Sequence, residues 1–262
     1  MSAFAIADRH VAGDSFVHRL DPRAKLIATL AFIIAAVITP QARWEVFAAM
    51  ATLLVIVIVL SGLSPLMILK RALLALPFVL AALPVLFNRS GGSELFEVPV
   101  FGWTATTEGL EALTSILLRS WLSVIAATLL TATTEADHIL RSLRAIGVPY
   151  ILVSTMSFMW RSIFVIGEEA QRMLRARESR SVKLGKKVGG SIRWRASVAG
   201  HMVGSLFLRT INRSERIYVA MQSRGYTGEL RSLHHFSMRS VDIVAVGVMV
   251  AALVTIQVYA HL

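Results

Sequence analysis

Long apolar stretches, separated by short polar breaks, are the feature that most constrains the fold of this chain. A helix that spans a bilayer needs roughly 20 mostly apolar residues, with about 17 as the lower end. Five stretches approach or reach this length: residues 24–39, 46–63, 72–87, 110–131 and 241–259. Of the 262 residues, 55% are hydrophobic and 16% are charged, whereas soluble domains carry about 25% charged residues. The sequence therefore predicts an all-α, polytopic membrane protein with about five transmembrane helices.

The segments outside these stretches have their own signals. Charged side chains recur throughout residues 8–25, so this segment does not resemble a cleavable signal peptide and predicts a short cytoplasmic leader. Between the third and fourth stretches, the alternating run from Phe96 to Gly102 predicts a small hairpin or surface loop, which we place outside the cytoplasm.

The charge of the chain predicts its orientation in the membrane. Residues 134–239 hold 18 basic and 7 acidic residues, which accounts for the whole net charge of +11. Basic segments beside spans stay on the cytoplasmic side. Counting back through four spans places the N-terminus inside as well. We therefore expect a multi-pass inner (plasma) membrane protein with three parts: a leader and four-helix transmembrane part (1–133), a cytoplasmic domain (134–239) and a final transmembrane helix (240–262).

Two long amphipathic helices are predicted within the basic segment. Apolar residues recur there every three or four positions, in one stripe that ends near Arg177 and a looser stripe that ends near Arg224. Gly225 is a natural helix stop, because glycine tolerates a left-handed backbone. The stripes comprise Met156, Trp160, Ile163, Ile166, Ala170 and Met173 in the first helix, and Val203, Leu206, Thr210, Ile217, Ala220 and Met221 in the second.

Residues 150–167 leave an alternative open, because they are nearly apolar and could form a further span. Arg161 interrupts them, and they continue directly into Glu168 and Glu169. We therefore favour a helix that lies against the inner face of the membrane.

Four short motifs carry a resemblance to a known family. They are HRLDPRAK (residues 18–25), TEADHILRSLRAIGVP (134–149), Ala176-Arg177-Glu178 and Ser223-Arg224-Gly225-Tyr226. In this order they resemble the transmembrane T components of energy-coupling-factor transporters. The run AMQSRGYTGEL (220–230) and the length resemble most closely the cobalt-transport subunit CbiQ.

The resemblance implies a non-catalytic scaffold that joins a CbiM-like, substrate-binding S component to two ATP-binding-cassette ATPases. ATP would be bound by those ATPases, so no cofactor is expected in this chain. Two short Ala-Arg-Gly motifs of the family dock into the ATPases. Carried over, the docking residues are Ala176, Arg177 and Glu178 in one motif and Ser223, Arg224 and Gly225 in the other. The first motif lacks the glycine and the second lacks the alanine, but both arginines are present.

Basic residues also have a simpler interpretation. Arg177 and Arg224 could belong to a general cationic surface, because positive charge beside the cytoplasmic leaflet binds anionic lipid. That surface comprises Arg172, Arg175, Arg180, Lys183, Lys186, Lys187, Arg193 and Arg195. Arg119 lies midway along the fourth predicted span, where it is a candidate contact for the S component. A structural role, in which Arg119 hydrogen-bonds carbonyls, Asn88 or Glu111, is the favoured alternative.

Other classes of function lack their motifs. None of the seven histidines forms a metal-binding HxxxH or HxxE pattern, so no metal site is expected. Gly185-Lys186-Lys187 lacks the remainder of a phosphate-binding loop, and no carboxylate pair lies inside a span. The function that the resemblance implies is ATPase coupling for cobalt uptake, with nickel or a vitamin as alternative substrates. An intramembrane enzyme, or a basic protein that binds anionic lipid, are the alternatives from other classes; nucleic acid is not an expected partner.

Overall fold

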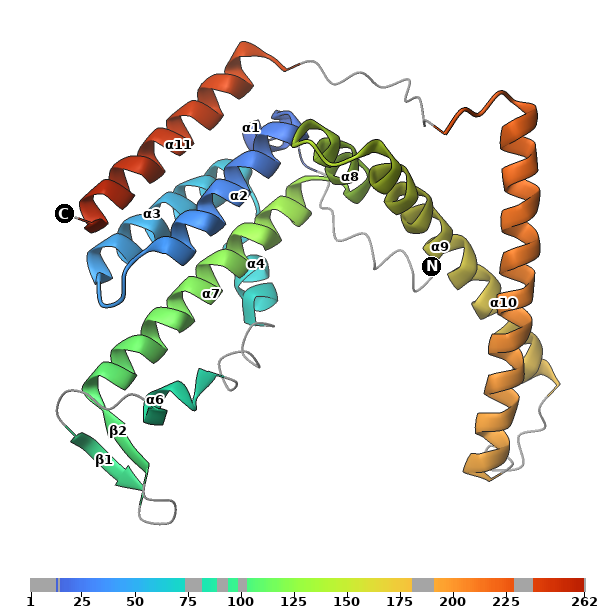
Figure 1. Ribbon diagram of the computed structural model, residues 1–262, viewed down its shortest axis with the longest axis horizontal. Helices are drawn as coiled ribbons and strands as arrows, with labels where there is room; N and C mark the ends of the chain where they lie inside the picture. Colours follow the sequence, from blue (N-terminus) through green and yellow to red (C-terminus); the bar gives the residue numbers. More distant parts are fainter. Residues whose placement is uncertain are drawn as a thin grey trace. The chain divides into compact units, whose positions relative to one another are not determined.

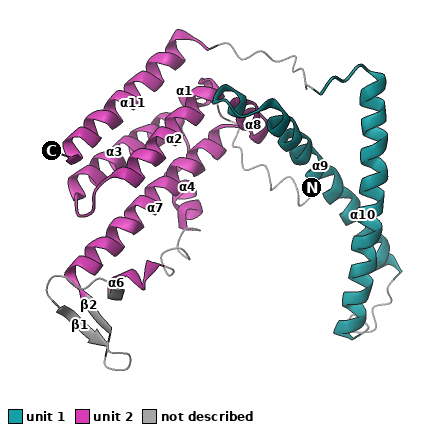
Figure 2. Ribbon diagram, viewed as in Figure 1, with its two compact units in different colours: residues 1–8, 143–235 teal, residues 9–142, 236–262 magenta. Residues whose placement is uncertain are grey.

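The computed structural model describes residues 13, 15–73, 82–88, 94–98, 103–180, 191–228 and 238–261. These residues are helical apart from turns, loops and one two-stranded hairpin (Figure 1). The chain divides into two compact units: unit 1 comprises residues 1–8 and 143–235, and unit 2 comprises 9–142 and 236–262 (Figure 2). The predicted class, a helical polytopic protein, is confirmed.

Unit 2 contains most of the helices and the hairpin. The strands β1 (Glu94–Val98) and β2 (Trp103–Thr106) pair antiparallel, with Val98 opposite Trp103, which confirms the predicted hairpin. The helices of this unit are α1 (Phe16–Arg19), α2 (Pro22–Ile38), α3 (Trp44–Ser61), α4 (Pro65–Ala72), α6 (Val85–Asn88), α7 (Thr107–Thr133), most of α8 (Ala136–Ala145) and α11 (Ser240–His261).

Local sequence signals explain where these helices begin and end. The side chain of Asp21 accepts a hydrogen bond from the backbone N–H of Arg23, and Pro22 follows at the first helical position of α2. Thr106 caps α7 in the same way by accepting from the N–H of Gly109. α3 ends at Gly62, whose φ of 66° is the left-handed conformation that favours glycine.

The core of unit 2 lies where α2, α3, α7 and α11 meet. Phe32, Met50, Leu122, Ala126 and Leu253 are all buried there. The opposite faces of the same helices expose large apolar side chains, including Ile34, Val59 and Val248. An exposed apolar surface of this extent is unfavourable in water, so hydrocarbon is its natural surrounding.

Four described helices are long and apolar enough to cross a membrane: α3, α7, α9 (Tyr150–Ser179) and α11. Three of them coincide with the predicted spans 46–63, 110–131 and 241–259. The first predicted span is α2, whose 17 residues lie at the lower end of the required length. Half of the third predicted span, 72–87, falls on residues 74–81, which lie outside the described residues. α9 qualifies by length and composition alone, so its placement on the inner face stays a prediction.

Gly109 is a site where the packing of α6 on α7 leaves no room for a side chain. A Cβ atom at this position would lie 2.3 Å from the backbone carbonyl oxygen of Leu86. We expect Gly109→Ala to lower the free energy of unfolding by about 1–3 kcal/mol, because the obstructing atom belongs to backbone that must shift. Thermal unfolding in detergent measures the change. Gly247→Ala in α11, where a Cβ meets nothing within 4 Å, is the matched control; equal effects of both variants would contradict the expectation.

Candidate coupling site

The two long helices of unit 1 match the two predicted amphipathic helices. They are α9 (Tyr150–Ser179) and α10 (Ile192–Ser223). The ring of Phe158 meets the ring of Tyr226 edge to face at 6.5 Å between centroids. Further along α9, Glu169 contacts Arg209 of α10. Since numbers rise along α9 as they fall along its partner, the two helices run antiparallel.

Arg224 occupies the C-cap of α10, in a motif that fixes its backbone. The N–H of Gly225 donates to the carbonyl of Gln222 (3.0 Å), and the N–H of Tyr226 donates to the carbonyl of Met221 (3.1 Å). This pair of bonds is the Schellman arrangement. Gly225 has φ of 78°, which confirms the prediction that it ends the helix. Tyr226 then packs on Phe158, so the tip that carries Arg224 is held against α9.

The positive φ of Gly225 leads to a specific prediction. A Cβ at this position would meet nothing within 4 Å, so Gly225→Ala adds no clash and costs only the left-handed backbone, about 1–2 kcal/mol. We expect the helix end to unwind and any partner bound through Arg224 to be retained about fivefold less well, the change that about 1 kcal/mol produces. Copurification measures this. Gly225→Asn, which tolerates the left-handed conformation, is expected to retain more partner than Gly225→Ala; the reverse order would contradict the argument.

The first motif lies in the last turn of α9 and has a different end. Ala176, Arg177 and Glu178 are all helical, and the helix continues to Ser179. The hydroxyl of Ser179 donates to the carbonyl of Ala176 (2.9 Å), and the N–H of Arg180 donates to the carbonyl of Arg177 (3.1 Å). Arg180, the C-cap of α9, has a right-handed backbone, and the motif has Glu178 where the other motif has Gly225. Arg177 is half-buried, whereas Arg224 is exposed.

The two arginines lie at opposite ends of the helical pair. Arg224 is near Phe158, through Tyr226, whereas Arg177 lies much further along α9. At a rise of about 1.5 Å per residue, the helix carries Arg177 about 28 Å from the level of Phe158. The two ends are therefore far enough apart for a separate partner protein to bind at each arginine.

α10 also presents an apolar surface. Within the described part of the chain, none of its residues is buried. Ile192 is 85% exposed, Val203 is 66% exposed and Phe207 is 64% exposed. Val203 and Phe207 are four residues apart, so they lie on the same face of the helix. Such a surface requires cover from lipid or from a partner.

Unit 2 contains a cluster of buried polar residues that joins three helices: Asp21, Lys25, Thr133 and Asp242. One carboxylate oxygen of Asp242 accepts from the backbone N–H of Asp21 (3.1 Å), and the other accepts from the N–H of Arg239 (2.9 Å). The ammonium group of Lys25 donates to the carbonyls of His18 (3.0 Å) and Thr133 (3.2 Å). This polar cluster ties the first turns of α2 and α11 to the last turn of α7.

The polar cluster gives a physical role to the HRLDPRAK motif. The sequence places Lys25 at the inner end of a span, where a lysine is expected to extend into the interface. Instead its side chain is buried, at 8% exposure, because carbonyl acceptors lie within reach inside the unit. Asp242 was not among the residues predicted for a site. A lone carboxylate at the start of an apolar stretch was the available signal, since such residues face a protein interior.

Arg119 bonds to a helix end. Its guanidinium donates to the carbonyl of Thr39, the C-cap of α2, at 2.6 Å. The amide of Gln257, from α11, donates to the carbonyl of Ala35 (2.7 Å) and to the hydroxyl of Thr39 (2.9 Å). The bond agrees with the structural interpretation of Arg119, because it supplies a donor to the carbonyl of Thr39 at the end of α2. A contact between Arg119 and a partner stays a prediction.

Metal-binding side chains do not gather in the described ranges. No group of three or more His, Asp or Glu residues there is arranged to hold a metal ion. The chemistry visible in these residues is that of helix ends, arginines and apolar surfaces, which suits binding to other proteins.

Comparison with known proteins agrees with this arrangement. Residues 13–236 match the family model CbiQ, described as a cobalt transport protein. The energy-coupling factor transporter transmembrane protein EcfT of Lacticaseibacillus paracasei is 30% identical over 231 residues, 84% of each chain. Its counterpart in Listeria innocua is 28% identical over 233 residues, 85% of each chain. An uncharacterised protein of Methanocaldococcus jannaschii is 27% identical over 243 residues, 90% of this chain and 80% of that protein.

The family match and the structure support each other. The matched residues include all four motifs on which the resemblance was based, and the apolar helices agree with a multi-pass membrane protein. The chain therefore belongs to the CbiQ family of cobalt transport proteins and is a transmembrane T component of the energy-coupling-factor type.

Proposed function

We propose that this chain transmits the motion of two ATPase subunits to a separate, substrate-binding membrane subunit. The observation that carries the proposal is the antiparallel pair α9–α10, in which Arg177 lies near one end and Arg224 at the opposite end. When the ATPases close on ATP, they would change the distance between the two docked ends of the α9–α10 pair. This movement of the helices would in turn tilt the substrate-binding subunit. The chain itself needs no ATP site for this role.

Arginine suits the docking role at each end. Its guanidinium is planar, always charged and weakly hydrated, so it can be buried against carboxylates or helix-end carbonyls of a partner. Arg177 and Arg224 would each enter one ATPase, supported by their neighbours Ala176, Glu178, Ser223 and Gly225. The separation of the two ends by about 28 Å, from the helical rise, supports one ATPase at each.

The apolar surface of α10 supports the second half of the proposal. Val203 and Phe207 are exposed on one face, and a substrate-binding membrane subunit of the S-component type would cover such a surface. Anionic lipid would neutralise the remaining basic residues if the helical pair lies on the cytoplasmic side. This placement requires a cytoplasmic N-terminus in the inner membrane.

Cobalt is the substrate that the family description favours. Nickel and vitamins stay open as alternatives, because a coupling subunit need not touch the substrate. The ion would be bound by the substrate-binding subunit rather than by this chain.

Purification from native membranes tests the proposal. A tagged full-length chain, solubilised in mild detergent, is expected to bring with it a nucleotide-binding ATPase at about two copies per chain, as the two arginine ends require, and a small membrane subunit. Mass spectrometry identifies the partners, and cobalt uptake by reconstituted vesicles measures activity. A preparation that transports cobalt without any ATPase would refute the proposal.

A further inference from the structure

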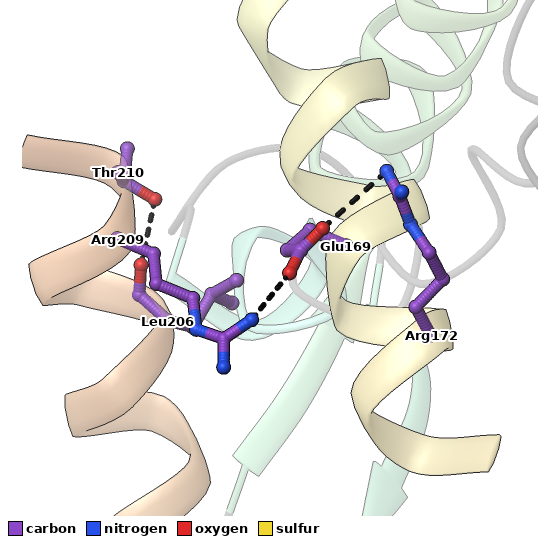
Figure 3. Close-up of polar contacts among 5 residues, drawn as sticks. All are labelled: Glu169, Arg172, Leu206, Arg209 and Thr210. Atoms are coloured by element: carbon purple, nitrogen blue, oxygen red, sulfur yellow. Dashed lines mark hydrogen bonds and ion pairs between the residues drawn. The ribbon is translucent and has the colours of Figure 1, made fainter. Parts of the chain in front are cut away.

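The carboxylate of Glu169 lies between α9 and α10 and links the two helices (Figure 3). Oε1 of Glu169 accepts from Nη1 of Arg209 on α10 at 2.8 Å. Oε2 of the same carboxylate lies 3.3 Å from Nη2 of Arg172, one turn further along α9. A single carboxylate thus holds one arginine from each helix.

The surroundings of Glu169 favour a defined geometry. Its side chain is 23% exposed, whereas Arg209 and Arg172 are 61% and 58% exposed. Both oxygens are engaged, so rotation of the carboxylate toward one arginine would weaken its contact with the other.

The position of this contact relates it to both ends of the pair. Arg177 lies about 12 Å further along α9 from Glu169, and Arg224 about 22 Å further along α10 from Arg209, by the helical rise. A change in the angle at which the helices cross near Glu169 would therefore change the distance between Arg177 and Arg224.

We propose that Glu169 is a positioning residue, which sets the crossing angle of α9 and α10 and thereby the distance between the docking arginines Arg177 and Arg224. This inference rests on the proposed function, since the spacing matters only if each arginine meets a partner. Glu169 touches neither partner; it acts through Arg209 and Arg172.

The first test measures the spacing in the full-length chain. The sequence contains no cysteine, so Ser179→Cys and Gln222→Cys place two spin labels uniquely, one beside each end. In lipid nanodiscs, Glu169→Gln is expected to broaden the distribution of label distances. Glu168→Gln, a neutralisation of the exposed neighbouring carboxylate, is the matched control and is expected to leave it unchanged. The exchange Glu169→Arg with Arg209→Glu is expected to narrow the distribution again.

The second test separates positioning from docking. With the ATPases and the substrate-binding subunit assembled, Glu169→Gln is expected to retain the ATPases but to raise the ATP hydrolysed per substrate transported by about two- to fivefold, the factor expected from losing one partly exposed ion pair. An unchanged distance distribution, or equal broadening by Glu168→Gln, would overturn the inference. Failure of the wild-type chain to bind any ATPase would instead refute the proposed function. The measured effect of Glu169→Gln on the label distances would not be affected by that failure.

Discussion

Replacing Arg177 and Arg224 together with alanine is expected to abolish stable binding of the ATPases. Truncating one partner of a buried, hydrogen-bonded charge pair commonly costs about 2–5 kcal/mol of binding. Even the lower figure corresponds to a loss of about 30-fold at each arginine. Quantitative copurification of the ATPases with the tagged chain measures the loss, and ATP-dependent cobalt uptake is expected to fall with it.

The chain offers matched controls for this experiment. Arg175 lies two residues before Arg177 on α9, and Arg213 lies on α10; both are exposed. Arg175→Ala with Arg213→Ala removes the same charge from the same helices but is expected to cost less than about 1 kcal/mol of binding. If both double variants retained the ATPases equally, Arg177 and Arg224 would belong to a general basic surface and the docking role would be wrong.

Asp242→Ala is expected to destabilise unit 2 by about 3–5 kcal/mol, the second large effect. The substitution removes the acceptor for the backbone N–H groups of Asp21 and Arg239, in a site where Asp242 is only 4% exposed. It also takes a negative charge from the surroundings of the buried ammonium group of Lys25. Thermal unfolding in detergent, followed by the loss of monodisperse protein, measures the change.

Asp137→Ala is the control for the loss of an aspartate. Asp137 pairs with Arg141 one helical turn away on α8, and both side chains are partly exposed. This substitution is expected to cost less than about 1 kcal/mol. A similar effect of the two aspartate substitutions would mean that the polar cluster does not hold the ends of α2, α7 and α11 together.

The elements with a periodic or compositional signal could be predicted from the sequence. The apolar runs identified α2, α3, α7 and α11, because hydrophobic length is what a span requires. The amphipathic stripes identified α9 and α10. Gly225 could be assigned to a helix end, because a left-handed residue there favours glycine for a local reason that does not depend on the rest of the fold.

Contacts between distant residues left no such signal. Asp21 and Asp242 are 221 positions apart, and Arg119 and Thr39 are 80 apart. Only the packing of α2, α7 and α11 brings these pairs together. The pairing of Glu169 with Arg209 was missed for the same reason, since each residue alone resembles an ordinary charge on a polar helix face.

α9 shows where two sequence signals compete. Its first half is apolar enough for a span, whereas Arg161, Glu168 and Glu169 favour an interfacial helix. Length and composition alone do not decide between a transmembrane and an interfacial α9, because both placements bury the same apolar stripe in lipid. The side of the membrane on which the ends of α9 and α10 lie decides it.

Labelling of introduced cysteines from each side of the membrane tests the central claim, that the basic helical pair faces the cytoplasm. Ser179→Cys and Ser191→Cys are the only thiols in their variants, because the chain has no cysteine of its own. A membrane-impermeant maleimide is expected to react with both in inverted vesicles and with neither in intact, right-side-out vesicles. Reaction of either thiol from the outer side alone would contradict the account.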